Sequence, residues 1–115
     1  MATEFDHSQL EAITGGDDEF EREILQEYLQ SAPADVAKVS AAVQAGDASA
    51  LASAAHALKG ASATIGAKGF AAIALELEHA GKAGDLACAP DAHGRLVSEF
   101  TELETFLATR IAKAA

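Results

Sequence analysis

Apolar residues recur at every third or fourth position between residues 20 and 43, a spacing that places them on one face of a helix. The set is Phe20, Ile24, Tyr28, Ala32, Val36, Val39 and Val43. Composition points the same way, because 29 of the 115 residues are Ala, the best helix former, whereas Trp is absent and residues that favour sheet are scarce. The chain is therefore expected to fold from closely spaced helices.

Capping signals indicate where the first helices begin and end. Ser8 and Glu11 have the spacing of a capping box, which predicts a short helix from Ser8 to Thr14 that stops at two consecutive glycines. The aspartates at positions 17 and 18 are suited to cap the next helix. The spacing of apolar residues predicts that this helix extends as far as Gly46. Pro33 is expected to kink or divide this second helix, because proline removes a backbone donor.

Three more helices complete the pattern. Asp47 is expected to cap a helix that ends at Gly66, and a fourth helix follows and is broken by the sequence GKAGD at residues 81–85. The last helix begins near Pro90. The inward residues expected on these three helices are Leu51, Leu58, Ile65, Phe70, Ile73, Ala74, Leu77, Leu96, Phe100, Leu103, Leu107 and Ile111. The prediction is an all-α fold, an antiparallel four-helix bundle with a short additional N-terminal helix, in a single domain over residues 1–115 whose bundle core spans about residues 17–112.

The charge balance limits the partners. Eight Lys and Arg against eighteen Asp and Glu give a formal net charge of −10, which repels a phosphate backbone and favours a monomer. Nucleic acid is therefore not expected as a partner. The N-terminal sequence lacks a basic start and a continuous apolar run, and no segment reaches the roughly 20 apolar residues that cross a bilayer. We expect a soluble protein without membrane association, and the single Cys88 fits a reducing cytoplasm.

His56 is expected to face away from the core. With about 100° of rotation per residue, its side chain lies about 140°, 160° and 180° around the helix from Leu51, Leu58 and Ile65, respectively. The residues on its own side are Ser49, Ala52, Ser53, Lys59, Gly60 and Ala63, and apart from the lysine they are small. Such a surround lets another protein approach closely, so Ser49, Ala52, Ser53 and Ala63 are candidate partner-binding residues. The other histidines, His7, His79 and His93, are interpreted as ordinary surface or satisfied core residues.

Two neighbours point to a nucleophilic histidine. Gly60 costs about 1 kcal/mol relative to Ala inside a helix, so its missing methyl group is interpreted as clearance for the imidazole of His56. The ammonium group of Lys59, one turn on, is expected to be exposed, to disfavour protonation of the ring and to pair with an anion attached to it. The other ring nitrogen then needs an acceptor that fixes the tautomer.

Glu78 is a candidate for that acceptor. If the third and fourth helices form a hairpin that turns at Gly66, His56 and Glu78 lie roughly 15 and 18 Å from the turn along the two axes, and are nearly level. Periodicity alone leaves open whether both side chains point into the shared groove or whether Glu78 is a solvated surface acid.

These residues resemble the signature of histidine-containing phosphotransfer (HPt) domains, small four-helix modules of two-component signalling. The matching residues are His56, Ala57, Leu58, Lys59 and Gly60, then Ser62, Gly66, Ala67 and Phe70, and the sequence LELE at residues 75–78. The resemblance covers roughly residues 17–110, and the combination of these residues at fixed offsets is more specific than the pentapeptide alone.

The resemblance implies a phosphoryl carrier. His56 would accept a phosphoryl group from a receiver-domain aspartate or a histidine kinase and pass it to a response-regulator aspartate, with Lys59 beside the phosphate, Gly60 as the clearance residue and Glu78 on the inner ring nitrogen. No cofactor is expected in this chain, since Mg²⁺ would belong to the partner receiver. No Gly-rich nucleotide loop is present, so the chain is expected to be a relay without an ATP site and not an enzyme. The very small Ala52, Ala61 and Ala63 depart from the larger apolar residues of many relatives.

Two alternatives remain open at the level of sequence. Glu76 and His79 form a Glu-x-x-His pattern of the kind found in di-iron bundles, and Glu4 with His7 repeats it, but neither Glu76 nor His79 is aimed at the core and no metal site is expected. The other alternative is a non-phosphorylated four-helix scaffold or inhibitor that binds receiver domains.

Overall fold

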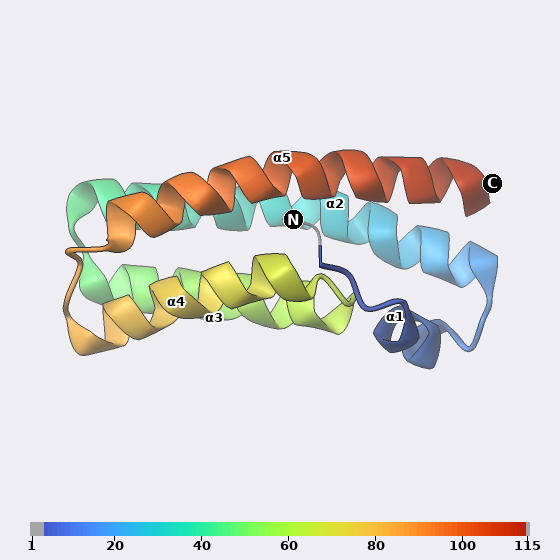
Figure 1. Cartoon of the computed structure of the whole chain (residues 1–115), viewed down its shortest axis with the longest axis horizontal. Helices are drawn as coiled ribbons and strands as arrows, with labels where there is room; N and C mark the ends of the chain where they lie inside the picture. Colours follow the sequence, from blue (N-terminus) through green and yellow to red (C-terminus); the bar gives the residue numbers. More distant parts are fainter. Residues whose placement is uncertain (1–3, 115) are drawn as a thin grey trace.

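The structure is a computed structural model that describes residues 4–114, and every regular element in this range is an α-helix (Figure 1). The helices are α1 (His7–Thr14), α2 (Asp18–Ala45), α3 (Ala48–Thr64), α4 (Lys68–Ala83) and α5 (Ala89–Ala114). The four long helices run alternately up and down; α2 packs against α3 and α5, and α4 does the same, while α1 contacts α2 at one end (Figure 1). The predicted all-α fold, a helical bundle with a short additional helix at its N-terminal end, is confirmed. No helix of the described range is both long and apolar enough to span a membrane.

The core is built from leucines and one aromatic pair. Fully buried leucines come from all five helices, and each stabilises the fold by roughly 1.5–3 kcal/mol relative to an exposed side chain. Those leucines are Leu10, Leu25, Leu51, Leu58, Leu77, Leu96, Leu103 and Leu107. Phe70 of α4 packs against Phe100 of α5 with ring centroids 5.4 Å apart. Of the expected inward residues on the last three helices, only Ile111 is not buried.

Most helix ends follow the capping signals. Asp17 and Asp47 accept backbone N–H bonds at the starts of α2 and α3, as expected. The short first helix is found at His7–Thr14 and ends at Gly15 as predicted, but its predicted capping residue is wrong, because Asp6 and not Ser8 supplies the cap by accepting from the N–H groups of Ser8 and Gln9. Aspartate at the N-cap accepts from the second and third helical N–H groups, which are those of Ser8 and Gln9, whereas a cap at Ser8 would have accepted from groups two or three residues farther on.

Helix α2 differs from its predicted form in two respects. Of the two alternatives for Pro33, a kink or a division, the division is wrong, because one helix runs through this residue. Phe20, which was expected to face the core, is 43% exposed, whereas Leu25 is fully buried. In the first two turns the buried positions are therefore those that follow the predicted ones by one residue. In the same turn Glu21 is buried and pairs with Arg110 of α5, whose Nε lies 2.8 Å from Glu21 Oε2.

The turn between α3 and α4 is fastened by the N-terminal segment. Gly66 has φ 91°, a left-handed conformation that favours glycine, and an added Cβ would collide with the Asp6 carbonyl group. The N–H of Asp6 donates to the Gly66 carbonyl at 2.7 Å, and Lys68 Nζ lies 3.0 Å from Asp6 Oδ2. The backbone hydrogen bond fastens the α3–α4 hairpin, on which the candidate site lies, whereas the Lys68 side chain is largely exposed and its ion pair adds little.

Candidate functional site

His56 projects from the outer face of α3. Its side chain is 66% exposed, whereas Leu51, Ala55 and Leu58 of the same helix are fully buried. The ring therefore faces away from the leucine core, as its helical rotation predicts. Gly60, one turn on, is open to solvent, and no atom lies within 4 Å of the place where its Cβ would be.

Glu78 of α4 reaches His56 from the neighbouring helix. Glu78 Oε2 lies 2.9 Å from His56 Nδ1, and the carboxylate side chain is only 2% exposed. The interpretation of Glu78 as a solvated surface acid is therefore wrong, and the two side chains do share the groove between α3 and α4. The helix face that buries Leu77 also buries Glu78.

Two lysines neutralise the buried carboxylate. Lys59 Nζ lies 2.9 Å from Oε1 and Lys82 Nζ lies 3.0 Å from Oε2. No hydrogen bond of good geometry reaches Oε1, so the ion pair with Lys59 is what compensates its burial. The ammonium group of Lys59, then that of Lys82, with a smaller contribution from the His56 hydrogen bond, hold the pKa of Glu78 at about 2 against the opposing effect of burial.

The ionised carboxylate fixes the proton arrangement of the imidazole. A carboxylate can only accept hydrogen bonds, so Nδ1 of His56 must be the donor to Glu78. When the ring is neutral, its single proton is thus on Nδ1 and the lone pair is on Nε2. An exposed nitrogen lone pair with a buried carboxylate behind the ring is the arrangement of a nucleophile.

Lys59 and Lys82 differ from the predictions. Lys59 was expected to be exposed, but its side chain is 29% exposed and is bound to Glu78. Lys82 was not identified from the sequence at all, although its spacing of four residues from Glu78 is the spacing of a helical ion pair and could have indicated it.

Gly81 brings the two helices together at the site. A Cβ at this position would lie 2.6 Å from the Ala52 nitrogen and 2.7 Å from the Ala48 carbonyl oxygen, closer than real Cβ atoms come to the backbone. The backbones of α3 and α4 therefore touch where only glycine fits. Because Glu78 and Lys82 lie on either side of Gly81 along α4, this contact sets how far they stand from His56.

A shallow pocket of about 380 Å³ opens beside the histidine. Its lining residues are Ser49, Ala52, Ser53, His56, Glu78 and Lys82. Three of the four candidate partner-binding residues thus surround the ring, while Ala63 is exposed farther along α3 and does not line the pocket.

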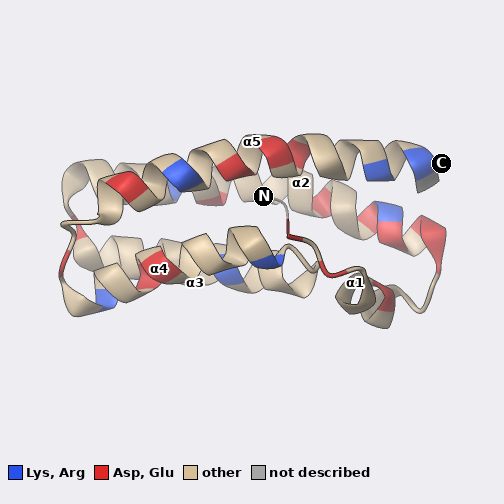
Figure 2. Ribbon diagram, viewed as in Figure 1, with Lys and Arg blue, Asp and Glu red and all other residues tan. Residues whose placement is uncertain are grey.

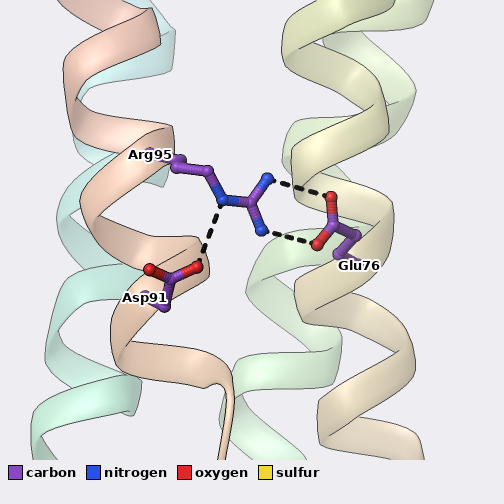
Figure 3. A network of polar contacts seen from close by, with 3 residues as sticks. All are labelled: Glu76, Asp91 and Arg95. Atoms are coloured by element: carbon purple, nitrogen blue, oxygen red, sulfur yellow. Dashed lines mark hydrogen bonds and ion pairs between the residues drawn. The ribbon is translucent and has the colours of Figure 1, made fainter.

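Glu76 and His79 do not form a metal centre. Arg95 of α5 binds Glu76 through two nitrogens, at 2.7 and 3.2 Å, and also contacts Asp91 (Figure 3). Arg95 lowers the pKa of the Glu76 carboxyl through these hydrogen bonds. His79 is exposed, and within residues 4–114 no group of three His, Cys, Asp or Glu side chains is arranged to hold a metal ion.

The remaining histidines take part in contacts between helices. His93 Nε2 of α5 lies 2.6 Å from the Ser40 hydroxyl of α2, and His7 Nδ1 lies 2.9 Å from Arg110 Nη1. Each ring thus makes one polar contact with another helix, as expected of an ordinary surface or core histidine.

Acidic residues are distributed unevenly over the bundle (Figure 2). Helices α3 and α4 carry three lysines and two glutamates, a net charge of +1, which leaves −11 on the rest of the chain. The face that bears His56 is thus the least acidic part of an acidic protein.

Comparison with known proteins assigns this bundle to a class of phosphorelay modules. The sequence pattern of the Hpt domain matches residues 23–106, and the chain belongs to the Hpt domain family, whose members are phosphoryl carriers in signal transduction and not catalytic enzymes. The structure is similar to the crystal structure of histidine-containing phosphotransfer protein B (HptB) from Pseudomonas aeruginosa PAO1, with a TM-score of 0.90, 26% sequence identity and 98% of each chain covered. No match was found among curated proteins.

Proposed function

We propose that His56 is the phosphoryl carrier of this Hpt domain, loaded by a receiver-domain aspartyl phosphate or a histidine kinase and unloaded to a response-regulator aspartate. The observation that carries the proposal is the hydrogen bond of 2.9 Å between His56 Nδ1 and the buried Glu78, on a ring that is 66% exposed. One nitrogen is held while the other faces solvent.

The transfer step is a displacement at phosphorus. The Nε2 lone pair of His56 forms the N–P bond while the bond between phosphorus and the aspartyl oxygen breaks, and the electron pair leaves on the aspartate carboxylate. The ring becomes cationic as the N–P bond forms. The Glu78 carboxylate stabilises that charge through Nδ1–H, in the way a carboxylate supports an imidazolium in other nucleophilic sites. The reverse step returns the phosphoryl group to an aspartate.

The chain supplies position, and the partner supplies the metal. Phosphoryl transfer depends mainly on alignment and charge neutralisation. The rigid hairpin of α3 and α4 provides the alignment, and Mg²⁺ would be brought by the acidic pocket of the receiver. Gly60 leaves room for that docking, and so do the small Ala52, Ser53 and Ala63 on the same face of α3.

The charge distribution supports an acidic partner surface. A receiver that presents a cluster of carboxylates would be repelled by most of this bundle but not by the face of α3 and α4, which has a net charge of +1. We further propose that the protein acts as a monomer in the cytoplasm, because its net charge of −10 opposes self-association and its Cys88 is a free thiol.

Transfer from a phosphorylated receiver tests the proposal. Receiver domains loaded with labelled phosphate are mixed with the protein, which is expected to take up label that is labile in acid and stable in alkali. His56→Gln should take up none, whereas His79→Gln, which removes an exposed histidine from the neighbouring helix, should take up as much as the wild type. Label that persists in His56→Gln would refute the assignment, and receiver binding without any label would favour the scaffold alternative.

A further inference from the structure

The two lysines on Glu78 are not equivalent. Lys59 is 29% exposed and contacts Oε1, whereas Lys82 is 63% exposed and contacts Oε2. Oε2 is also the oxygen that accepts the hydrogen bond from His56 Nδ1. Lys82 therefore shares its carboxylate oxygen with the histidine, and Lys59 does not.

The pocket beside the histidine lies on the side of Lys82. Lys82 lines it together with His56, whereas Lys59 is not among its lining residues. Ser49 and Ser53 also line this pocket, so its lining includes two hydroxyl-bearing residues and a cation, and its one carboxylate, Glu78, is buried. The buried Glu78 at its base is already compensated by Lys59.

We infer that a phosphoryl group on His56 is bound in this pocket by Lys82, which exchanges its contact with Glu78 for a phosphoryl oxygen. The inference rests on the proposed phosphorylation of His56. When the ring becomes cationic, its Nδ1–H forms a stronger, charge-assisted bond with Oε2, so the other donor on that oxygen is the one released. In the loading step the N–P bond forms as the donor's own bond to phosphorus breaks, and the electron pair leaves with the donor group, so the exchange at Glu78 itself makes and breaks no covalent bond.

This exchange keeps each charge paired. Lys59 remains on Oε1 and Nδ1–H on Oε2, so the buried carboxylate never lacks a cation. The phosphoryl group gains the more exposed of the two ammonium groups, whose side chain lines the pocket together with His56. Lys82 thus acts as a phosphoryl-binding residue, and Lys59 holds Glu78 in place.

Phosphorus NMR of the protein loaded with phosphoramidate tests the inference, since this small donor phosphorylates histidine without a receiver. Lys82→Gln should raise the pH midpoint of the second phosphoryl ionisation and slow loading about two- to fivefold, the effect of losing one exposed charge pair. Lys68→Gln is the matched control, because Lys68 is also on α4, is 62% exposed and also has a carboxylate oxygen at 3.0 Å. It should behave as the wild type.

Three results would overturn the inference. The first is that Lys82→Gln and Lys68→Gln have the same pH midpoint and the same loading rate. The second is that Lys59→Gln shifts the pH midpoint and Lys82→Gln does not. The third is that phosphoramidate does not phosphorylate His56 of the wild type. The proposed function can fail separately. If loading by phosphoramidate depends on Lys82 as expected but no receiver exchanges label with the protein, the relay function is contradicted and the inference about Lys82 still holds.

Discussion

Glu78 Oε2 lies 2.9 Å from His56 Nδ1, although the two residues are 22 positions apart and belong to different helices. The contact joins a carboxylate that is 2% exposed to an imidazole that is 66% exposed. The buried partner fixes the orientation and the proton of the exposed one, so reactivity at Nε2 depends on a side chain that is almost wholly shielded from solvent.

Replacing Glu78 should slow phosphoryl transfer more than it disturbs docking. Glu78→Gln keeps an oxygen for Nδ1–H but removes the charge that stabilises the cationic ring, and we expect transfer from a phosphorylated receiver to slow roughly tenfold. Single-turnover transfer kinetics measure this. Glu76→Gln makes the same change at an exposed position on the same helix and should leave the rate unchanged; equal rates for both variants would remove Glu78 from the site.

Acid should weaken the fold partly through Glu78. Its pKa is about 2 in the folded protein against an ordinary value of 4.5, chiefly because of Lys59, so its contribution to stability is complete above about pH 4.5 and is lost as the pH falls through 2. The free energy of unfolding, measured with denaturant, should be larger for the wild type than for Glu78→Gln at pH 5, and this difference should shrink as the pH falls to 2. A difference that stays constant from pH 5 to pH 2 would contradict the pairing.

Gly81 and Gly60 should respond in opposite directions to a methyl group. Gly81→Ala places a Cβ 2.6 Å from the Ala52 nitrogen, so α4 must move, and we expect a loss of about 1–3 kcal/mol of stability together with slower transfer. Gly60→Ala meets nothing within 4 Å and should stabilise α3 by about 0.5–1 kcal/mol. Thermal unfolding compares the stabilities of the two variants. A Gly81→Ala variant more stable than the wild type would show that the backbones of α3 and α4 are not in close contact at this position.

Clearance at Gly60 is a separate question from stability. Gly60→Gln adds a long side chain on the exposed face beside His56, and we expect it to block receiver transfer while loading by phosphoramidate continues. Normal transfer from the receiver would mean that this position does not face the docked partner.

Tyr28 should titrate late. Burial, opposed in part by the 2.7 Å hydrogen bond between its hydroxyl group and that of Ser62, raises the pKa of Tyr28 to about 12. Its stabilising contribution is therefore complete below about pH 10 and is lost as the pH rises through 12. The chain has one Tyr and no Trp, so absorbance near 295 nm reports this residue alone. A midpoint near 10 in the folded protein would show that the hydroxyl is solvated.

Local signals in the sequence predicted the helices well. Asp17, Asp47 and Gly46 mark helix ends because caps depend on a few neighbouring residues. Rotation about one axis likewise predicted that His56 faces away from Leu51 and Leu58.

Contacts between helices were beyond these signals. Phe20 is exposed where its neighbour Glu21 pairs with Arg110, 89 residues away, and no signal within one helix indicates such a pair. The burial of Glu78, and hence the partial burial of Lys59, depends on how closely α3 and α4 approach at Gly81. Periodicity describes one helix at a time, so it identified the site histidine but not the full set of charges around it.

The most direct test of the central claim is to determine which nitrogen of the His56 ring carries the proton and which carries the phosphoryl group. Long-range correlation of ¹H and ¹⁵N in the imidazole of His56, recorded before and after loading from a phosphorylated receiver, identifies which nitrogen carries the proton and which carries phosphorus. We predict the proton on Nδ1 in both states and the phosphoryl group on Nε2. Phosphorus on Nδ1, or ring signals of His56 that do not change on loading, would contradict the account.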